Sequence, residues 1–363
     1  MRTPCLLPDL GMRTIFIAVA SVIRDRVGWN ALGFLASVTV LCLAGFTLYR
    51  MLRDVQPDRV LSAVAAIPAS HIALSIAFVA GAYFTITFYD FFSLRTIGAR
   101  QVPYRIAALA AFTSFSIGHN LGATVFTGGA IRFRIYSAWG LSLIDIAKIA
   151  FITGLTFWLG NAFVLGLGMA IAPEAASALD QFPPWVNRAI GLAGLGVICG
   201  YLLWLSTGLK TVGVKHVCVT LPNAPLTFVQ ILIGVADLGL SAIGMYVLLP
   251  ANPPLEILPV IVIFVLATLL GFLSHTPGAL GVFDAAILIA LVQYPKEDLL
   301  ATLLVWRAIY YILPFSLALV VMATRELWLA HRRRAGLQPP CEPPLRVPAA
   351  CAQQRQSAQD PTA

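Results

Sequence analysis

The stretch IAALAAFTSFSIGHNLGATVFTGGAI, residues 106–131, is apolar enough to enter a membrane but is interrupted by polar residues and glycines. Gly118-His119-Asn120 lies at its centre, and Gly128-Gly129 lies near its end. A helix satisfies its own backbone hydrogen bonds in lipid, whereas irregular backbone at membrane depth survives only where it lines protein or water. The stretch therefore predicts a re-entrant element, two half-length helices joined within the membrane, in which the glycine pair ends a half-helix and frees backbone donors.

The rest of the chain is also rich in apolar runs. Of its 363 residues, 59% are hydrophobic and 11% are charged. Several runs exceed the ~18–20 residues that cross a bilayer, and the segments between them leave no room for a soluble domain. Eight crossings are predicted, at residues 29–48, 68–91, 149–171, 187–206, 226–249, 257–274, 279–293 and 299–323.

These runs define the fold class and the domain plan. The chain is predicted to be an all-α polytopic membrane protein of about eight transmembrane helices plus the re-entrant element. Residues 29–325 form the membrane domain, residues 1–28 an interfacial or cytosolic arm, and residues 326–363 a basic, disordered tail rich in proline and glutamine.

The net charge of +8 resides mainly in loops and tails. With a cytosolic N-terminal arm, most of the basic loops fall on the cytosolic side, as the positive-inside rule requires, and both termini are predicted to be cytosolic. The first external loop, which holds Arg50, Arg53 and Arg59, is a mild exception. This distribution requires no nucleic-acid partner, and the six scattered cysteines predict no metal or cofactor site.

A faint internal echo links the two halves of the chain. Thr127-Gly-Gly-Ala-Ile-Arg-Phe133 resembles Thr276-Pro-Gly-Ala-Leu-Gly-Val-Phe283, and each lies beside a broken apolar stretch with a histidine. Corresponding broken segments in two halves of a membrane protein are typical of a transport site. The echo favours an internal two-fold repeat, although chance similarity of two glycine-rich turns is the alternative.

Four ionisable residues lie within or at the ends of the predicted crossings: Asp90, Asp237, Asp284 and Arg307. A charge at the bilayer centre costs roughly 2.5–3.5 kcal/mol on insertion scales, so each needs a partner or a cavity. Asp237 and Arg307 could form a structural ion pair, and Asp90 could be an interfacial cap. Aromatic residues near the ends of the runs, Tyr136 and Tyr310 among them, are typical of an interfacial belt.

The same residue types suit a ligand with a zwitterionic end and an apolar end. Arginine binds phosphate through two parallel hydrogen bonds, free backbone N–H groups at a half-helix N-terminus bind it as well, and buried carboxylates attract amines. We expect Arg132, helped by Arg134 or Arg307, to bind a phosphate, and the acidic residues to face an amine. A phospholipid headgroup fits this description. A purely topogenic role for Arg132 and Arg134 is the alternative.

The motifs that carry this chemistry occur in a recognisable order. They are Tyr89-Asp90, then Asn120-Leu-Gly with Thr127-Gly-Gly-Ala-Ile-Arg132 and Tyr136, then Asp237, then Ser274-His-Thr-Pro-Gly-Ala-Leu-Gly-Val-Phe-Asp284, then Arg307-Ala-Ile-Tyr-Tyr. Over roughly residues 30–325 the series resembles the flippase region of bacterial lysylphosphatidylglycerol synthases, the multiple peptide resistance factors, a region shared with stand-alone inner-membrane proteins.

The resemblance implies a multi-pass protein of the bacterial cytoplasmic membrane that moves aminoacylated phosphatidylglycerol to the outer leaflet and thereby protects against cationic peptides. It implies functional roles for Asp90, Arg132 and Asp237. Because the soluble transferase domain of bifunctional relatives is missing here, we expect no enzyme activity and a possible separate lipid-modifying partner. The predicted translocation site comprises Asp90, Asn120, Gly128, Gly129, Arg132, Arg134, Asp237, Asp284, Arg307 and Tyr310.

Other classes of function remain open. A carrier of another lipid, such as an isoprenoid- or hopanoid-linked one, a solute transporter, or a scaffold for a lipid-synthesis complex would share these features. An intramembrane aspartyl protease is a remote alternative, because Gly281-Val-Phe-Asp284 lacks the second glycine of the protease motif. No P-loop occurs, so ATP is not expected to drive the process directly.

Overall fold

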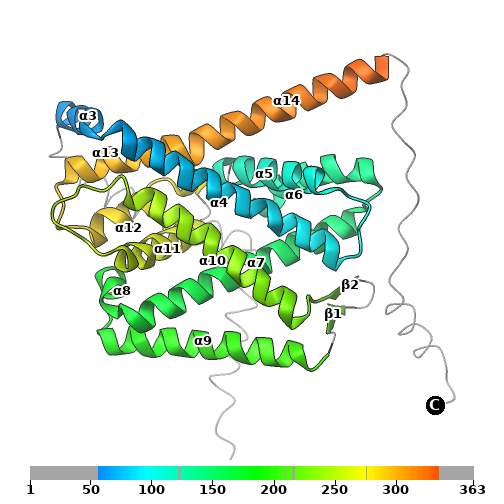
Figure 1. Cartoon of the computed structure of the whole chain (residues 1–363), viewed down its shortest axis with the longest axis horizontal. Helices are drawn as coiled ribbons and strands as arrows, with labels where there is room; N and C mark the ends of the chain where they lie inside the picture. The colour runs from blue at the N-terminus through cyan, green and yellow to red at the C-terminus, as the bar shows by residue number, and fades with distance from the viewer. Residues whose placement is uncertain (1–55, 122–123, 209, 215–216, 275, 335–363) are drawn as a thin grey trace, which may run out of the picture.

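The computed structural model describes residues 56–121, 124–208, 210–214, 217–274 and 276–334. This part of the chain is almost entirely helical, which confirms the predicted all-α class (Figure 1). The sequence did not predict a short antiparallel hairpin of strands β1 (Thr211–Val214) and β2 (Val217–Thr220). The N-terminal arm, the predicted crossing at 29–48 and the tail beyond residue 334 lie outside the described residues.

The helices are numbered in chain order, with two 3-10 turns, η1 and η2, and one π-helical segment, η3. Their bounds are α3 (Pro57–Ala66), α4 (Ala69–Thr96), α5 (Tyr104–Leu121), α6 (Thr124–Tyr136), η1 (Ser137–Trp139), α7 (Leu143–Ile171), α8 (Pro173–Asp180), α9 (Pro184–Ser206), α10 (Ala224–Tyr246), α11 (Ile257–Leu273), η2 (Pro277–Ala279), α12 (Val282–Ala290), α13 (Lys296–Arg307), η3 (Ala308–Ile312) and α14 (Leu313–Arg334).

Five helical segments of the described chain are long and apolar enough to cross a membrane. They are α4, α7, α9, α10 and the continuous segment from α13 through η3 into α14. The last of these continues to Arg334, so the tail predicted to be disordered begins within a helix. These segments match the crossings predicted at residues 68–91, 149–171, 187–206, 226–249 and 299–323.

The crossings predicted at 257–274 and 279–293 correspond to apolar helices shorter than the five long spans. Helix α11 has 17 residues and α12 has 9, so α12 is only about 14 Å long against a hydrocarbon core of ~30 Å. The two helices form a hairpin closed by η2. Phe283 packs its ring edge-to-face on Phe264 with centroids 5.7 Å apart, and a Cβ added at Gly271 would lie 2.5 Å from the Cβ of Ala279.

The stretch 106–131 also forms a helical hairpin, but its break is not where the glycines predicted it. Helix α5 continues through His119 and Asn120 to Leu121, and α6 begins at Thr124 and contains both Gly128 and Gly129. The glycine pair therefore does not end a half-helix. Gly128 instead lies against α5, because a Cβ there would meet the carbonyl oxygen of Ser114 at 3.4 Å.

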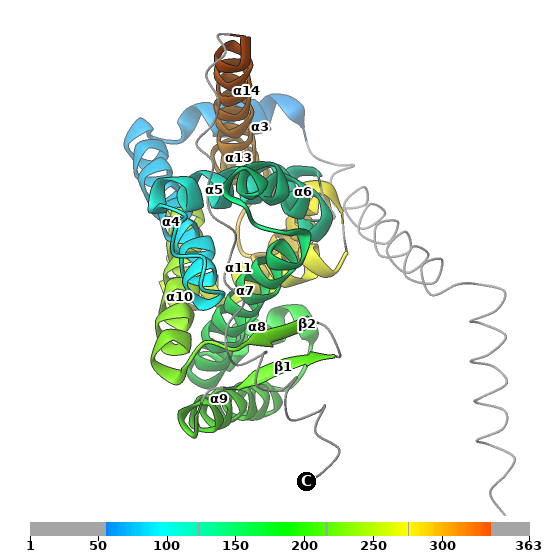
Figure 2. The same cartoon turned by 90° about the vertical axis from the view of Figure 1, so that its right-hand side faces the viewer.

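The two hairpins lie on either side of a contact between α5 and η2. In Figure 1, α5 and α6 lie toward the right, whereas α11 and α12 lie toward the left beside the start of α13; in Figure 2, α5 and α6 face the viewer and α11 lies behind them. The echoed residues are not equivalent locally. Thr127-Gly-Gly-Ala is helical, whereas Gly278 in η2 has a φ of 60°. Each half of the chain therefore contains a helical hairpin, but the echoed residues have different backbone conformations in the two hairpins.

Long helices connect and support the hairpins. Helix α7 begins with a capping box in which Ser142 and Asp145 each bond the other's backbone N–H. It crosses α10 at Gly160 and Gly234, where a Cβ on Gly160 would lie 2.8 Å from the Cα of Gly234. Small residues let membrane helices approach this closely. Helix α4 packs against both α5 and α10, which places its polar residues between the first hairpin and the centre of the molecule.

Candidate functional site

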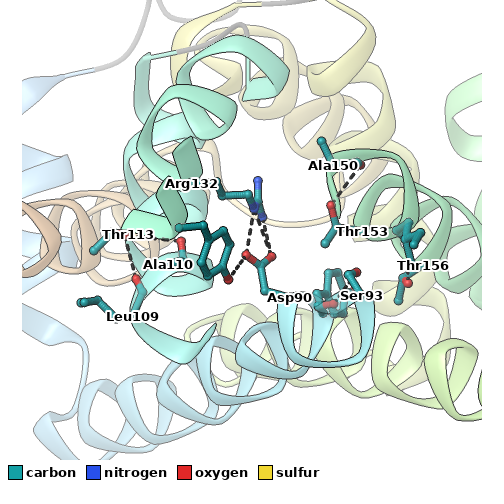
Figure 3. Close-up of polar contacts among 12 residues, drawn as sticks. Asp90, Ser93, Leu109, Ala110, Thr113, Arg132, Ala150, Thr153 and Thr156 are labelled. Carbon is teal, nitrogen blue, oxygen red and sulfur yellow. Dashed lines mark hydrogen bonds and ion pairs between the residues drawn. The ribbon is translucent and has the colours of Figure 1, made fainter. Parts of the chain in front are cut away.

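The first cluster of buried charge joins α4 to α6 (Figure 3). Arg132 donates from Nε to both Asp90 oxygens, at 3.1 and 2.9 Å, and from Nη2 to Asp90 Oδ1 at 2.8 Å. Tyr136 donates to Asp90 Oδ2 at 2.8 Å. Asp90 is fully buried and Arg132 is 6% exposed. Asp90 is therefore the anchor of a closed ion pair and is not an interfacial cap.

Packing around this pair depends on two neighbours. A Cβ on Gly128 would come within 3.3 Å of Arg132 Nη1, so glycine leaves the room that the guanidinium occupies. The Phe115 ring lies 5.7 Å from Arg132 Cζ, a cation–π contact on the apolar side of the guanidinium. No such constraint applies at Gly129, where an added Cβ meets nothing within 4 Å.

The second cluster joins α12 to the end of α13. Arg307 donates from Nε to Asp284 Oδ1 at 3.0 Å and from Nη2 to Asp284 Oδ2 at 2.6 Å. Its Nη1 donates to the carbonyl oxygen of Gly278 at 3.0 Å. The side chains are 14% and 12% exposed, so this pair is more accessible than the first. The predicted pair of Asp237 with Arg307 is wrong, because Asp284 and the η2 turn already hold the guanidinium.

Asp284 reaches this position because α12 begins just before it. Its Oδ2 accepts the backbone N–H of Gly281 at 3.1 Å, which closes the first turn of the helix. Gly281 has a φ of 80°, a conformation that glycine adopts without steric cost. The glycine-rich run before Asp284 therefore bends the chain sharply and fixes the carboxylate on Arg307.

A π-helical segment follows Arg307 directly. π-Helical turns occur often at functional sites because they leave carbonyl groups free of the regular helical pattern. Here the carbonyl oxygen of Tyr310 accepts the Tyr83 hydroxyl at 3.1 Å, and that of Tyr311 accepts the Asn120 amide at 3.2 Å. Asn120 also donates to Ser116 O at 2.8 Å. The end of α5 is thereby tied to η3.

Asp237 lies on α10 between these two clusters. It is 5% exposed and accepts a hydrogen bond from the Tyr89 hydroxyl at 3.0 Å. Tyr89 precedes Asp90 in α4, and its ring packs edge-to-face on Phe115 with centroids 5.6 Å apart. Helix α4 therefore contacts Asp237 through Tyr89 and contacts Arg132 through the next residue, Asp90.

The structure brings most of the predicted site residues into this region, with two exceptions. Arg134 is exposed and pairs with Glu326 of α14 at 2.6 Å, on a different face of α6 from Arg132. Gly129 has no close neighbour of its own. Tyr310 takes part through its carbonyl oxygen, which accepts the Tyr83 hydroxyl, and through its ring, which stacks on Trp306 with centroids 4.8 Å apart. It therefore does not belong to an interfacial belt.

Tyr89 and Tyr136 were named within the sequence motifs, but the hydrogen bonds of their hydroxyls were not predicted, and Tyr83 was not named. Tyr83, Tyr89 and Tyr136 each donate to a carboxylate or carbonyl of the site. Tyr136 is fully buried, so its assignment to an interfacial belt is wrong. Its position one helical turn after Arg132 was an available signal, since residues at i and i+4 share a helix face.

The arrangement does not favour the aspartyl-protease alternative. Such enzymes need two carboxylates that share one proton. Here Asp284 is bound by Arg307 and Asp90 by Arg132, while Asp237 bonds Tyr89. What the site offers is two carboxylate–guanidinium pairs and one further acidic residue, all inside a helical membrane fold.

Fold and site together define a polytopic α-helical membrane protein with paired charges at two helical hairpins. The chain belongs to the family of membrane proteins that includes slr0712 of Synechocystis sp. strain PCC 6803, with which it shares 30% identity over 259 residues, 69% of this chain and 78% of that protein. It is also similar to the inner membrane protein YbhN of Escherichia coli, at 25% identity over 280 residues, 75% and 82% of the two chains.

A third similarity is shorter. Phosphatidylglycerol lysyltransferase of Staphylococcus haemolyticus shares 41% identity with this chain over 76 residues, which is 20% of this chain and 9% of that enzyme. No protein-family model matches the chain. The comparisons thus relate this membrane protein to the lysylphosphatidylglycerol synthase family.

Proposed function

We propose that this protein moves a phospholipid across the bacterial cytoplasmic membrane, from the inner to the outer leaflet. The observation that carries the proposal is the pair formed by Arg307 and Asp284 at the η2 turn. Among the membrane-embedded ion pairs of the described chain, it is the more exposed one, and it lies beside the irregular backbone of a short helical hairpin. Transport sites in membrane proteins are typically built at such broken helices.

Both ends of a zwitterionic headgroup can be accommodated at this pair. A phosphate matches the guanidinium fork that Asp284 now occupies, because carboxylate and phosphate accept the same two parallel hydrogen bonds. When phosphate displaces Asp284 from Arg307, the carboxylate is released for the ammonium of an aminoacyl group. The two exchanges offset each other, so neither charge is left unpaired inside the membrane during the passage of the headgroup.

The Arg132–Asp90 pair plays a different part in this proposal. The carboxylate binds one edge of its guanidinium, through Nε and Nη2, and Phe115 lies against it. A headgroup reaches it only when the α5–α6 hairpin moves away from α4. We assign it to the closed state, in which it holds the first hairpin against α4 while the second hairpin is accessible.

The cargo that fits best is aminoacylated phosphatidylglycerol, the lysyl form above all. The partial similarity to phosphatidylglycerol lysyltransferases supports this choice, since those enzymes are named for that lipid. The described residues carry the transport-like site, so we assign the chain a transporter role and leave synthesis of the lipid to a separate enzyme. Movement of this lipid to the outer leaflet lowers the negative surface charge and so protects against cationic peptides.

A leaflet assay on the reconstituted full-length chain tests the proposal. Labelled lysylphosphatidylglycerol is placed in one leaflet of vesicles, and its appearance in the other leaflet is followed. We expect Arg307→Ala to slow translocation by about tenfold or more, because a charge-assisted hydrogen bond is worth about 1.5–3 kcal/mol. Arg134→Ala is the matched control, since Arg134 is exposed and contacts Glu326.

Two further variants make the outcome decisive. Arg307→Lys keeps the charge but loses the bidentate fork, so its rate should fall between those of the wild type and Arg307→Ala. Asp284→Asn should slow an aminoacylated lipid more than unmodified phosphatidylglycerol. Equal rates for wild type and Arg307→Ala, at equal amounts of folded protein, would overturn the proposal. Movement of a neutral solute without lipid would favour the solute-transporter alternative.

A further inference from the structure

Asp237 differs from the other two buried carboxylates of the described chain. Asp90 and Asp284 each form an ion pair with an arginine, whereas Asp237 has the Tyr89 hydroxyl as its hydrogen-bond partner. Within the described residues no lysine, arginine or histidine forms an ion pair with it. Its side chain is almost completely buried near the middle of α10.

On α4, which packs on α10, Asp90 is paired with Arg132, Arg95 lies over the Phe91 ring, and His71 lies in the first turn. Tyr83 and Tyr89 on α4 and Tyr310 on η3 are the titratable groups that interact electrostatically with Asp237. Helix α11 contains no titratable residue, and the charged residues of α7, Asp145 and Lys148, lie in its first two turns. On α9, Arg188 bonds the carbonyl oxygen of Ala170. An ionised Asp237 would therefore be isolated.

An isolated ionised carboxylate in a low-dielectric interior is far more costly than its neutral form. Neutralisation requires a proton or a metal cation. The Tyr89 hydroxyl uses its hydrogen to donate to Asp237 Oδ2. This contact suits a carboxyl group whose second oxygen carries a proton, and it supplies one oxygen neighbour where a metal cation would need several.

Polar groups continue along the same face of α10. Gln230, Asp237 and Ser241 are spaced by seven and four residues, which places them on one face of the helix. The buried Ser241 hydroxyl lies toward the Tyr310 hydroxyl, and both amide atoms of Gln230 are buried without a hydrogen-bond partner in the described structure. Ser75 on α4 has a buried hydroxyl in the same state, and its backbone lies beside Gly244, one turn beyond Ser241.

Buried polar groups that lack a protein partner are generally satisfied by ordered water. The stripe from Gln230 to Ser241 extends about 16 Å along the helix axis, roughly half of the hydrocarbon core. Water bound along this stripe would connect Asp237 to both ends of α10. The carboxyl group can release its proton to water on one side and accept a proton from water on the other.

We propose that Asp237 is a proton-binding site, served by the polar stripe of Gln230 and Ser241, and that its proton is the coupling ion of transport. In each cycle the carboxylic acid gives one proton to water and becomes a carboxylate, which the Tyr89 hydroxyl stabilises, and it then takes up one proton. That the coupled process is lipid movement rests on the function proposed above; the proton site itself does not.

Infrared spectroscopy of the full-length chain in phosphatidylglycerol vesicles tests the site directly. At neutral pH we expect the carbonyl band of a protonated carboxylic acid, which shifts when H₂O is exchanged for D₂O. Asp237→Asn should abolish this band, whereas Glu174→Gln, at an exposed carboxylate of α8, should leave it unchanged. Tyr89→Phe should shift the band, because it removes the hydrogen bond to the carboxyl group. A missing band, or one that persists in Asp237→Asn, would overturn the proposal.

A second measurement links the site to transport. The leaflet assay with labelled lysylphosphatidylglycerol is repeated with and without an imposed pH difference across the vesicle membrane. The wild-type rate should respond to the pH difference, and the Asp237→Asn rate should not. A band together with pH-insensitive lipid movement overturns the coupling. A band without lipid movement supports the proton site and overturns the lipid function. Lipid movement without a band supports the lipid function and overturns the proton site.

Discussion

Arg132 and Arg307 make the same kind of contact in different surroundings. Each binds one aspartate through the Nε–Nη2 edge of its guanidinium. Arg132 is sealed between α4, α5 and α6, whereas Arg307 retains some exposure beside an irregular turn. A buried ion pair contributes little net stability, although the loss of one partner is costly. The Arg132–Asp90 pair therefore chiefly fixes the position of the α5–α6 hairpin. The Arg307–Asp284 pair is available to a ligand.

We predict that Arg132→Met lowers the free energy of unfolding by about 3–5 kcal/mol, because it leaves Asp90 charged, buried and unpaired. The double variant Asp90→Asn/Arg132→Met should recover most of this loss, since the asparagine is neutral and still accepts the Tyr136 hydroxyl. Unfolding of the purified full-length chain in detergent measures both. Additive losses in the double variant would show that the two residues act independently.

At this scale the sequence predicted which residues matter better than it predicted their partners. Asp90, Arg132, Asp284 and Arg307 stood out because charges are rare in apolar helices. Their pairing depends on the distance between elements far apart in the chain, which is why a pair of Arg307 with Asp237 was one alternative. The tyrosine hydroxyls were missed because tyrosine is equally common in interfacial belts, and only burial separates the two roles.

At the scale of elements, the α5–α6 hairpin depends on one glycine of the adjacent pair. We predict that Gly128→Leu separates the two helices and lowers thermal stability, because even a Cβ there would press on Arg132 and on the Ser114 carbonyl. Gly129→Ala is the matched control on the same helix. It should be neutral, or stabilising by up to about 1 kcal/mol, since alanine favours the helix and has open space.

Thermal unfolding of the two variants in detergent checks this prediction, and cysteine cross-linking between α5 and α6 reports on their separation. A destabilised Gly129→Ala with an intact Gly128→Leu would reverse the assignment. From sequence alone both glycines marked a break in the chain. The actual break follows Leu121, because glycine within a helix weakens the helix only modestly and can instead permit close packing.

Element length was the other limit of sequence reasoning. Apolar runs predicted the five long spans well, because length and hydropathy alone decide whether a helix can cross. At 257–274 and 279–293 the apolar runs correspond to two short helices that form a hairpin around η2. Apolarity does not distinguish a short helix buried among other helices from one that spans the lipid. The glycines of the turn, Gly278 and Gly281, were the sequence signal that this region consists of short helices.

For the whole molecule, the two hairpins meet where α5 packs on η2, so the Arg132 and Arg307 clusters lie on connected elements. The two are connected at the centre, where Asn120 of α5 bonds the backbone of η3 and Arg307 bonds Gly278. Movement of one hairpin is therefore transmitted to the other through a few hydrogen bonds. An internal repeat inverted across the membrane would produce this placement, and it is the arrangement from which alternating access is commonly built.

This arrangement predicts the topology of the chain. Because α5 and α6 return to the end from which they start, Arg100 before the hairpin and Ser137 after it should face the same side of the membrane, which we expect to be the cytosol. Glu174 on α8, reached after the α7 crossing, should face the opposite side. All three positions are exposed.

Cysteines placed singly at these three positions, in a background whose six native cysteines are replaced, can be labelled by a membrane-impermeant maleimide in intact and in opened cells. Arg100→Cys and Ser137→Cys should react only after opening, and Glu174→Cys should react in both. Labels on opposite sides for Arg100→Cys and Ser137→Cys would mean that α5 and α6 together cross the membrane. The first hairpin would then not be re-entrant, and the proposed movement of α6 from Asp90 toward a headgroup would lose its structural basis.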